Sequence, residues 1–152
     1  MLSTLNQTTA QADGRFLSDQ ELQELQAYVN SFQVRRQAYQ LLSQNSDTLV
    51  ISALKQLAAT HYQEVKTYSA KCKRDMDYAL KEIAKAVLMD GEDVFKQGFS
   101  LWMENITRAV HRGNSAAQAY AYLKAEIIKT MPEDCAALVV PYVDDLIMSF
   151  GG

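Results

Sequence analysis

Apolar and polar positions alternate along this chain with the spacing of α-helices. One apolar stripe consists of Leu22, Leu25, Val29 and Phe32, which recur every three or four residues. A longer stripe, within a helix expected over residues 64–89, consists of Cys72, Met76, Ala79, Leu80, Ile83 and Val87. Because this spacing places each set on one helical face, the pattern predicts an all-α protein.

Start and stop signals divide the pattern into about six or seven helices. Ser18 and Glu21 form a capping box before a helix that runs toward Ser43, with a break near Asn30-Ser31. Further helices are expected at 49–59, 64–89, 93–111, 116–130 and 132–150, with breaks at 45–47, 90–91 and 112–115. Gly91 is expected as a left-handed helix cap, and Pro141 should kink the last helix. Short connections between helices favour a globin-like arrangement around a pocket.

Composition and charge narrow the class of protein. Gly (6) and Pro (2) are scarce among 152 residues, and 48% of residues are hydrophobic, which suits one helical domain with a sizeable core. The net charge of −3 argues against a nucleic-acid partner. No apolar run approaches the roughly 18 residues of a membrane span. Residues 1–14 are polar and unlike a secretory signal, so we expect a cytoplasmic protein.

The segment Cys72-Lys73-Arg74-Asp75 places a thiol, a guanidinium and a carboxylate within one helical turn. Cys72 and Asp75 share a face, and the long Arg74 side chain can fold back toward it. Lys66, Lys71, Lys73 and Arg74 surround the thiol with positive charge. These cations predict a lowered pKa for Cys72 and a more reactive thiolate. On this local pattern alone, an inert core cysteine remains the simpler interpretation.

The same segment, extended to Met76, resembles the Cys-x-Arg-Asp attachment site of phycobiliproteins, the bilin-carrying light-harvesting proteins of cyanobacteria and red algae. Other stretches resemble the family in order along the chain. They are Gly14 to Leu22, Ser43 to Val50, Val87 to Gly91, and Tyr142-Val143-Asp144. The first of these is similar to the start of the second N-terminal helix of beta subunits. Ordered similarity along nearly the whole chain is more specific than one tetrapeptide.

The resemblance implies a globin-like phycobiliprotein domain over residues 1–152. Cys72 would form a thioether to a linear tetrapyrrole, with phycocyanobilin the expected one. Arg74 would pair with a propionate, and Asp75 would accept from the inner pyrrole N–H groups. Lys73 and Tyr78 complete the expected binding residues. The implied function is to absorb light and transfer excitation energy within a phycobilisome-type assembly.

The resemblance also implies partners. Residues 1–32 would form helices that bind a partner, with the globin-like core at 33–152. The partner would be a phycobiliprotein subunit of the other type or a second copy, in a dimer that builds trimeric or hexameric rings and contacts a linker protein. The expected apolar face consists of Leu2, Leu5, Phe16, Leu25, Tyr28 and Phe32. The location would be the cytoplasmic or stromal face of thylakoid membranes.

Departures from the family pattern affect the pocket and the second cysteine. The stretch between Leu57 and Cys72 is several residues shorter than the usual family loop, and Tyr62 lies near the place where beta subunits carry Asn. Cys135 resembles the second attachment cysteine of phycocyanin-type beta subunits, although the insertion that normally precedes it is missing. Cys135 is therefore either a second bilin site or a structural thiol near a helix N-terminus.

Two alternatives keep the fold but change the function. The first is a scaffold, assembly or regulatory protein that docks on phycobilisomes without harvesting light. The second is a heme-binding globin-like sensor that would use His61 or His111 as the iron ligand. His61 lies in a polar break and His111 at an expected helix end, where a surface or capping role suits both better. Neither histidine is spaced from a Cys or Glu as metal ligands are. No catalytic motif indicates an enzyme.

Overall fold

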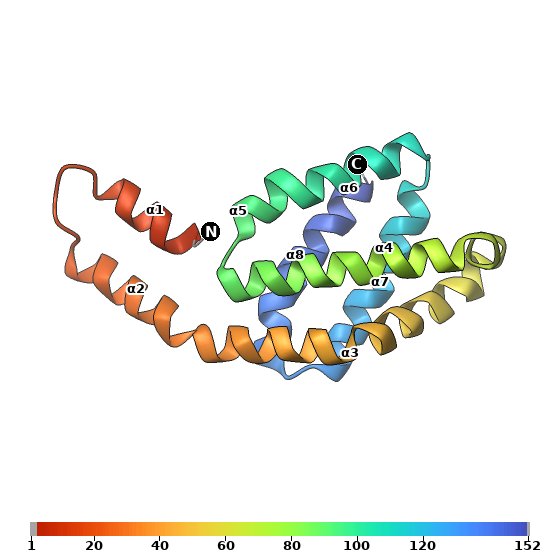
Figure 1. Cartoon of the computed structure of the whole chain (residues 1–152), viewed down its shortest axis with the longest axis horizontal. Helices are drawn as coiled ribbons and strands as arrows, with labels where there is room; N and C mark the ends of the chain where they lie inside the picture. Colours follow the sequence, from red (N-terminus) through yellow and green to blue (C-terminus); the bar gives the residue numbers. More distant parts are fainter. Residues whose placement is uncertain (1–2, 152) are drawn as a thin grey trace.

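The chain folds into helices joined by short connections in the computed structural model, which describes residues 3–151 (Figure 1). In chain order they are α1 (Ser3–Gln11), α2 (Asp19–Asn30), α3 (Phe32–Thr60), α4 (Tyr62–Met89), α5 (Glu92–Val94), the π-helical turn η1 (Phe95–Ser100), α6 (Leu101–Ala109), α7 (Gly113–Thr130) and α8 (Glu133–Gly151). All regular secondary structure within residues 3–151 is helical, as the pattern predicted. The long helices α3 and α4 lie side by side, and α7 and α8 cross behind them.

Helix α3 is continuous, so the predicted break at residues 45–47 was wrong. The Asn45 side-chain amide donates to the carbonyl of Leu41 at 2.9 Å and does not cap a new helix. Leu42 and Leu49 lie on either side of the polar run and are both buried. Burial of this apolar face outweighs the preference of Asn, Ser and Asp for turns.

Only His61 separates α3 from α4. Its backbone N–H donates to the carbonyl of Leu57 at 2.8 Å, and α4 begins at the next residue. The shortened stretch before Cys72 therefore forms helix on both sides of one turn residue. As a result, Cys72 lies about three turns inside α4, on a rigid element.

The core lies between α3, α4, α7 and α8. Its largest fully buried apolar side chains include Leu42, Val50, Leu80, Ile83, Leu123, Ile127, Val139, Val143 and Leu146. Burial of one such side chain contributes roughly 1.5–3 kcal/mol. This core fixes α4 and α7 relative to each other and therefore fixes the walls of the cavity that lies between them.

The cap at the end of α4 differs from the prediction. Asp90, with φ of 49°, takes the left-handed conformation that was expected of Gly91, whose φ is −104°. Asp90 also holds the start of α1, because its carbonyl accepts from Ser3 N at 2.8 Å and its carboxylate accepts from Thr4 N at 2.8 Å. Asp is among the few residues that tolerate this conformation, and here it caps two helices.

The predicted helix over residues 93–111 is present as one continuous helical segment from Glu92 to Ala109, with a π-helical turn inside it. It contains α5, η1 and α6, and the chain turns at His111, which has a φ of 54°. Helix α7 therefore starts at Gly113, inside the predicted break at 112–115. Gly113 approaches α8 so closely that an added Cβ would collide with the carbonyl oxygen of Phe150. This close approach requires glycine and closes one end of the cavity.

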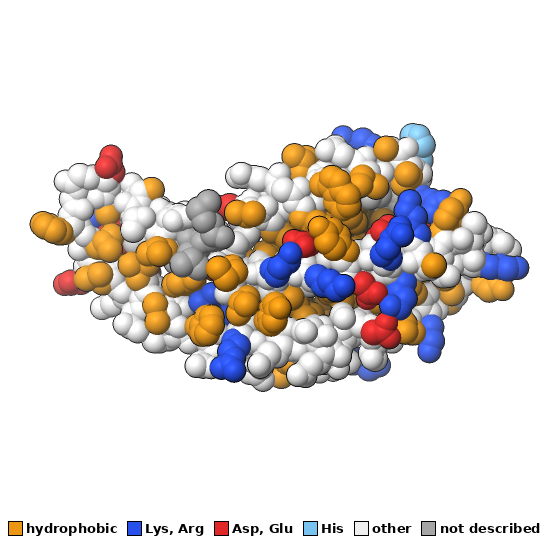
Figure 2. All heavy atoms as spheres, in the orientation of Figure 1, with side chains coloured by type: hydrophobic (Ala, Val, Ile, Leu, Met, Phe, Trp, Pro, Cys, Tyr) orange, Lys and Arg blue, Asp and Glu red, His pale blue; other side chains and the backbone are white. Residues whose placement is uncertain are grey.

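Helices α1 and α2 extend away from the core (Figure 1). The predicted capping box is confirmed, since Glu21 N donates to Ser18 Oγ and Ser18 N donates to the Glu21 carboxylate. No residue of α2 is buried. Leu5, Phe16 and Phe32 of the expected partner face are exposed, Leu25 and Tyr28 are partly buried, and Leu2 lies outside the described residues. Figure 2 shows apolar side chains along this arm, and the partner-binding role stays a prediction.

Candidate functional site

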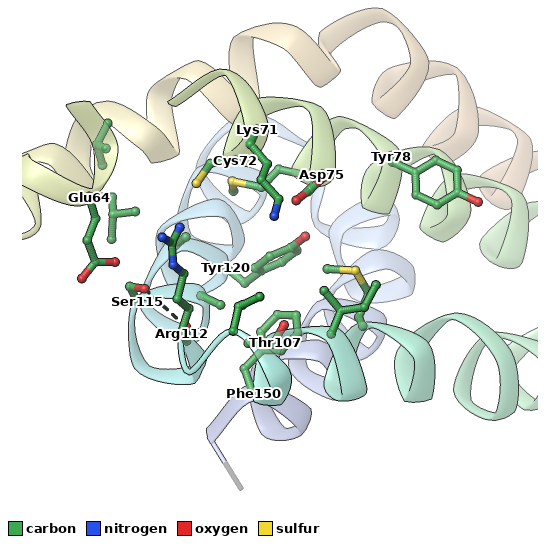
Figure 3. Close-up of a pocket in the computed structure, with 18 of the residues that line it drawn as sticks. Glu64, Lys71, Cys72, Asp75, Tyr78, Thr107, Arg112, Ser115, Tyr120 and Phe150 are labelled. Atoms are coloured by element: carbon green, nitrogen blue, oxygen red, sulfur yellow. Dashed lines mark hydrogen bonds between the residues drawn. The ribbon is translucent and has the colours of Figure 1, made fainter. Parts of the chain in front are cut away.

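A cavity of about 250 Å³ lies between α4, α6 and α7 (Figure 3). Its lining is mostly apolar, with Met76 and Leu57 at depth and Phe150 of α8 closing one end. The polar side chains that line it are Glu64, Lys71, Cys72, Asp75, Thr107, Arg112, Ser115 and Tyr120. An apolar cavity with a few convergent polar groups is the usual form of a ligand site.

Cys72 lies on the α4 wall of this cavity, half-buried, as a free thiol. Burial raises the pKa of the thiol above its usual value of 9.0, and the nearby charges only partly offset this. Among those charges Arg112 lowers the pKa most, Asp75 and Glu64 raise it, and Lys71 lowers it slightly. The predicted lowering of the pKa was therefore wrong, because desolvation outweighs the cations.

Asp75 and Tyr78 also line the cavity. The helical spacing predicted this for Asp75, whereas Tyr78 was expected from the family resemblance. Asp75 is one turn from Cys72 on the same face of α4. Tyr78 stands at the rim, with its ring centroid 5.5 Å from that of Phe99 and 6.3 Å from that of Trp102, both in edge-on geometry. Trp102, Ile106 and Val110 are all exposed, and Figure 2 shows apolar side chains gathered over α6 on this face.

Arg74 and Lys73 do not line this cavity. The Arg74 side chain is 75% exposed, with its Nε 3.8 Å from the Asp75 carboxylate. Lys73 Nζ is held between Asp47 at 2.6 Å and Asp77 at 2.8 Å, on the α3 side of α4. These positions follow from helical geometry, because a residue one or two places from Cys72 lies about 100–200° around the helix.

Arg112 is a cavity residue that the sequence did not reveal. Its guanidinium lies over the ring of Tyr68, 3.5 Å from the centroid, at the cavity mouth. No ion pair joins Arg112 to an acidic side chain within residues 3–151. Forty positions separate it from Cys72 in the chain, so only the crossing of α4 by α7 brings the two together.

Tyr120 of α7 is a second such residue. Its hydroxyl is buried and has no hydrogen-bond partner among the described residues. Burial, followed by the charges of Asp75 and Cys72, raises the pKa of Tyr120 far above its usual value. The helical pattern alone could not distinguish this tyrosine from a packing residue.

Cys135 lies away from this cavity, in the core between α3 and α8. It is fully buried, and its sulfur lies 4.0 Å from the carbonyl oxygen of Val34. Burial raises the pKa of the Cys135 thiol, and Asp134 raises it further. This environment is that of a structural thiol.

His61 and His111 lie in a neighbouring polar cleft that Arg112 also borders. The ring of His61 is 2.9 Å from Thr60 Oγ1, and His111 occupies the turn before α7. Neither histidine lines the cavity beside Cys72. The arrangement gives no support to an iron ligand inside the helical core.

Comparison with known proteins identifies the family. The sequence profile described as Phycobilisome protein matches residues 7–150. The chain belongs to this family. Phycobilisome proteins are light-harvesting subunits that carry covalently linked bilins and assemble with other subunits. The match and the helical structure confirm the predicted all-α, globin-like phycobiliprotein fold.

No curated protein matched the chain. Within residues 3–151 no helix is both long enough and apolar enough to cross a membrane. The phycobilisome protein family does not by itself specify a subtype, a bilin or the residues that bind it. The candidate binding residues are those that line the cavity beside Cys72.

Proposed function

We propose that this phycobilisome protein holds one linear tetrapyrrole in the cavity between α4, α6 and α7, joined to Cys72 by a thioether. The observation that carries the proposal is that the Cys72 thiol and the Asp75 carboxylate line one apolar cavity, at the segment that resembles the family's attachment motif. Phycocyanobilin is the bilin that the sequence resemblance favours. Cys135, buried in the core, serves as a structural thiol, so attachment is at Cys72 alone.

The cavity has features that suit such a ligand. Its volume of about 250 Å³ is just below the roughly 300–1,000 Å³ of typical ligand pockets. The ligand would therefore extend onto the exposed apolar rim of Tyr78, Trp102, Ile106 and Val110. The unpartnered Tyr120 hydroxyl supports a polar ligand group at depth, because a buried polar group without a partner costs stability.

Each residue has a defined part in this proposal. Cys72 Sγ would hold the tetrapyrrole as a thioether, formed by addition of the thiol S–H across an exocyclic carbon–carbon double bond of the bilin, with sulfur on one carbon and the proton on the other and no oxidant needed. Asp75 accepts hydrogen bonds from pyrrole N–H groups and favours their protonated form. Tyr78 and Trp102 line the cavity and would pack against the rings and restrict their rotation, with Phe99 supporting the Tyr78 ring from outside the lining.

When bound, the tetrapyrrole supplies visible absorption and an excited state. Helix α4, which carries Cys72 and Asp75, would restrict torsion of the bound tetrapyrrole and so lengthen the excited state, which allows energy transfer to a neighbouring subunit. The exposed apolar arm of α1 and α2 supports pairing with another phycobiliprotein subunit or with a second copy. We place the assembled protein on the cytoplasmic face of thylakoid membranes, with no enzymatic role.

A second candidate function is a phycobilisome scaffold or assembly protein that binds bilin weakly or not at all. Two observations favour it. The pKa of the Cys72 thiol is raised, which disfavours the nucleophilic thiolate, and Arg74 is 75% exposed and does not line the cavity. The two candidates differ in whether the chain acquires a covalent pigment.

Coexpression with a bilin biosynthetic pathway and a matching lyase tests the proposal. The denatured protein should give a zinc-dependent fluorescent band on a gel, and Cys72→Ser should abolish that band. The matched control is Cys135→Ser, which should keep it. A wild-type protein that stays colourless with every lyase tried would favour the scaffold function.

A further inference from the structure

The wall of the cavity opposite Cys72 carries two polar groups that lack the partners such groups usually have in the described part of the chain, a hydrogen-bond acceptor for one and a carboxylate for the other. The Tyr120 hydroxyl is buried without a hydrogen-bond partner among the described residues. The Arg112 guanidinium stacks on Tyr68 and is not paired with a carboxylate in that part of the chain. Both line the cavity, and Figure 3 shows Arg112 and Tyr120 below α4 on the side that faces Cys72 and Asp75.

The two groups differ in depth. Arg112 directly precedes α7 and lies at the mouth of the cavity, whereas Tyr120 is on α7 and only 3% exposed. Eight residues of helix span about 12 Å, so the two groups reach well-separated parts of one elongated ligand. Their spacing suits a molecule with an anionic substituent near solvent and an acceptor oxygen at depth.

We propose that the α7 wall binds the ligand through Arg112, which pairs with a carboxylate, and Tyr120, which donates a hydrogen bond to a carbonyl oxygen. This inference rests on the proposed function, because it concerns the same tetrapyrrole in the same cavity. The α4 wall then attaches the ligand, and the α7 wall fixes its orientation.

Arg112 suits this role better than Arg74 in this chain. Arg74 is 75% exposed and outside the cavity lining, whereas Arg112 lines the cavity and its guanidinium carbon lies 3.5 Å from the centroid of the Tyr68 ring. A guanidinium binds a carboxylate through two parallel hydrogen bonds, and a stacked guanidinium loses less freedom on binding. Stacking on Tyr68 leaves the N–H edge of Arg112 available for such a pair.

The chain provides its own probe for the test, because Trp102 is its one tryptophan and lines the cavity. Quenching of Trp102 fluorescence would report non-covalent binding of biliverdin, a linear tetrapyrrole with two carboxylates, to a Cys72→Ser background. Biliverdin dimethyl ester is the matched ligand without charge. The dimethyl ester should bind the Cys72→Ser protein about fivefold more weakly than biliverdin does, as expected when one charge-assisted contact is lost.

Arg112→Gln should weaken biliverdin binding about five- to tenfold and leave binding of the ester within about twofold. The control Arg108→Gln, at an exposed arginine that pairs with Glu104, should change neither. Tyr120→Phe should weaken the binding of both biliverdin and its dimethyl ester by about three- to tenfold, because both ligands keep the carbonyl oxygen. Tyr122→Phe on the same helix is its control.

The outcomes separate the two levels of the account. If neither ligand quenches Trp102 in the Cys72→Ser background, the proposed function and the inference both fail. If biliverdin binds but Arg112→Gln weakens acid and ester equally, the carboxylate assignment is overturned. If Tyr120→Phe binds both ligands as tightly as the background, the role of Tyr120 is overturned. If the Arg112→Gln protein does not fold, the Cys72→Ser protein alone still tests the pairing of Arg112 with a carboxylate. Equal affinity of that protein for biliverdin and for its dimethyl ester would overturn the pairing.

Discussion

The guanidinium carbon of Arg112 lies 3.5 Å from the ring centroid of Tyr68, which holds the turn before α7 against α4 close to Cys72. This contact joins two walls of the cavity without the use of a carboxylate. It leaves the positive charge at the cavity mouth and contributes to stability at the same time.

The contact between Arg112 and Tyr68 should be measurable in the protein without ligand. Tyr68→Leu should lower the free energy of unfolding by about 0.5–1 kcal/mol, the usual contribution of a cation–π pair near the surface. In a double-mutant cycle with Arg112→Gln, measured by urea denaturation, the two losses should not add. Additive losses would show that the two side chains do not interact in solution.

The thiol of Cys72 should be alkylated more slowly than a free cysteine, although it lines an open cavity. Because burial raises its pKa above 9.0, less thiolate is present at pH 8 than for a free cysteine. In a Cys135→Ser background, the rate of alkylation by iodoacetamide should still be rising with pH above 9. Arg112→Gln should slow the reaction further, since it removes the largest charge effect that lowers the pKa of Cys72. A rate that levels off below pH 8 would contradict this assignment.

Asp90 should couple the start of α1 to the end of α4. Asp90→Ala should cost about 1–3 kcal/mol of unfolding free energy, because it removes the cap on Thr4 and places alanine in a left-handed conformation. Asp90→Gly keeps the conformation and loses only the cap, so it should cost less. In both variants the amides of α1 should exchange hydrogen faster. Unchanged exchange in α1 would show that Asp90 does not hold this helix.

Two glycines provide a matched pair for the packing of α7 against α8. Gly113→Ala should destabilise the protein by about 1–3 kcal/mol, because the new Cβ would press on the Phe150 carbonyl. Gly98→Ala meets no atom within 4 Å and lies in a helical segment, so it should be neutral or stabilise by up to about 1 kcal/mol. Thermal unfolding of both variants would check this. Equal effects would contradict the close approach at Gly113.

Local sequence signals predicted the parts of this fold that depend on near neighbours. The capping box at Ser18 and the shared face of Cys72 and Asp75 followed from spacing alone and agree with the structure. The predicted break at residues 45–47 failed because the buried positions of Leu42 and Leu49 carry α3 through a polar run. The choice of Asp90 over Gly91 as the left-handed cap depends on α1, which lies far away in the sequence.

The candidate site was predictable on one wall only. Cys72 and Asp75 are three residues apart on α4, so a helical pattern could place them together, whereas Tyr78 is six residues from Cys72 and about 240° around the helix. Arg112 and Tyr120 reach the cavity through the crossing of α7, and no periodicity within α7 points at α4. The pKa of Cys72 was misjudged for a related reason: the burial that raises it comes from distant helices, and of the two cations that lower it, Arg112 and Lys71, only Lys71 is close in sequence.

The most direct test of the central proposal is peptide mapping by mass spectrometry after coexpression with a bilin pathway and lyase. We expect a single added tetrapyrrole, located on the peptide that contains Cys72, with Cys135 unmodified. A protein that carries no tetrapyrrole, or carries it on Cys135, would contradict the account.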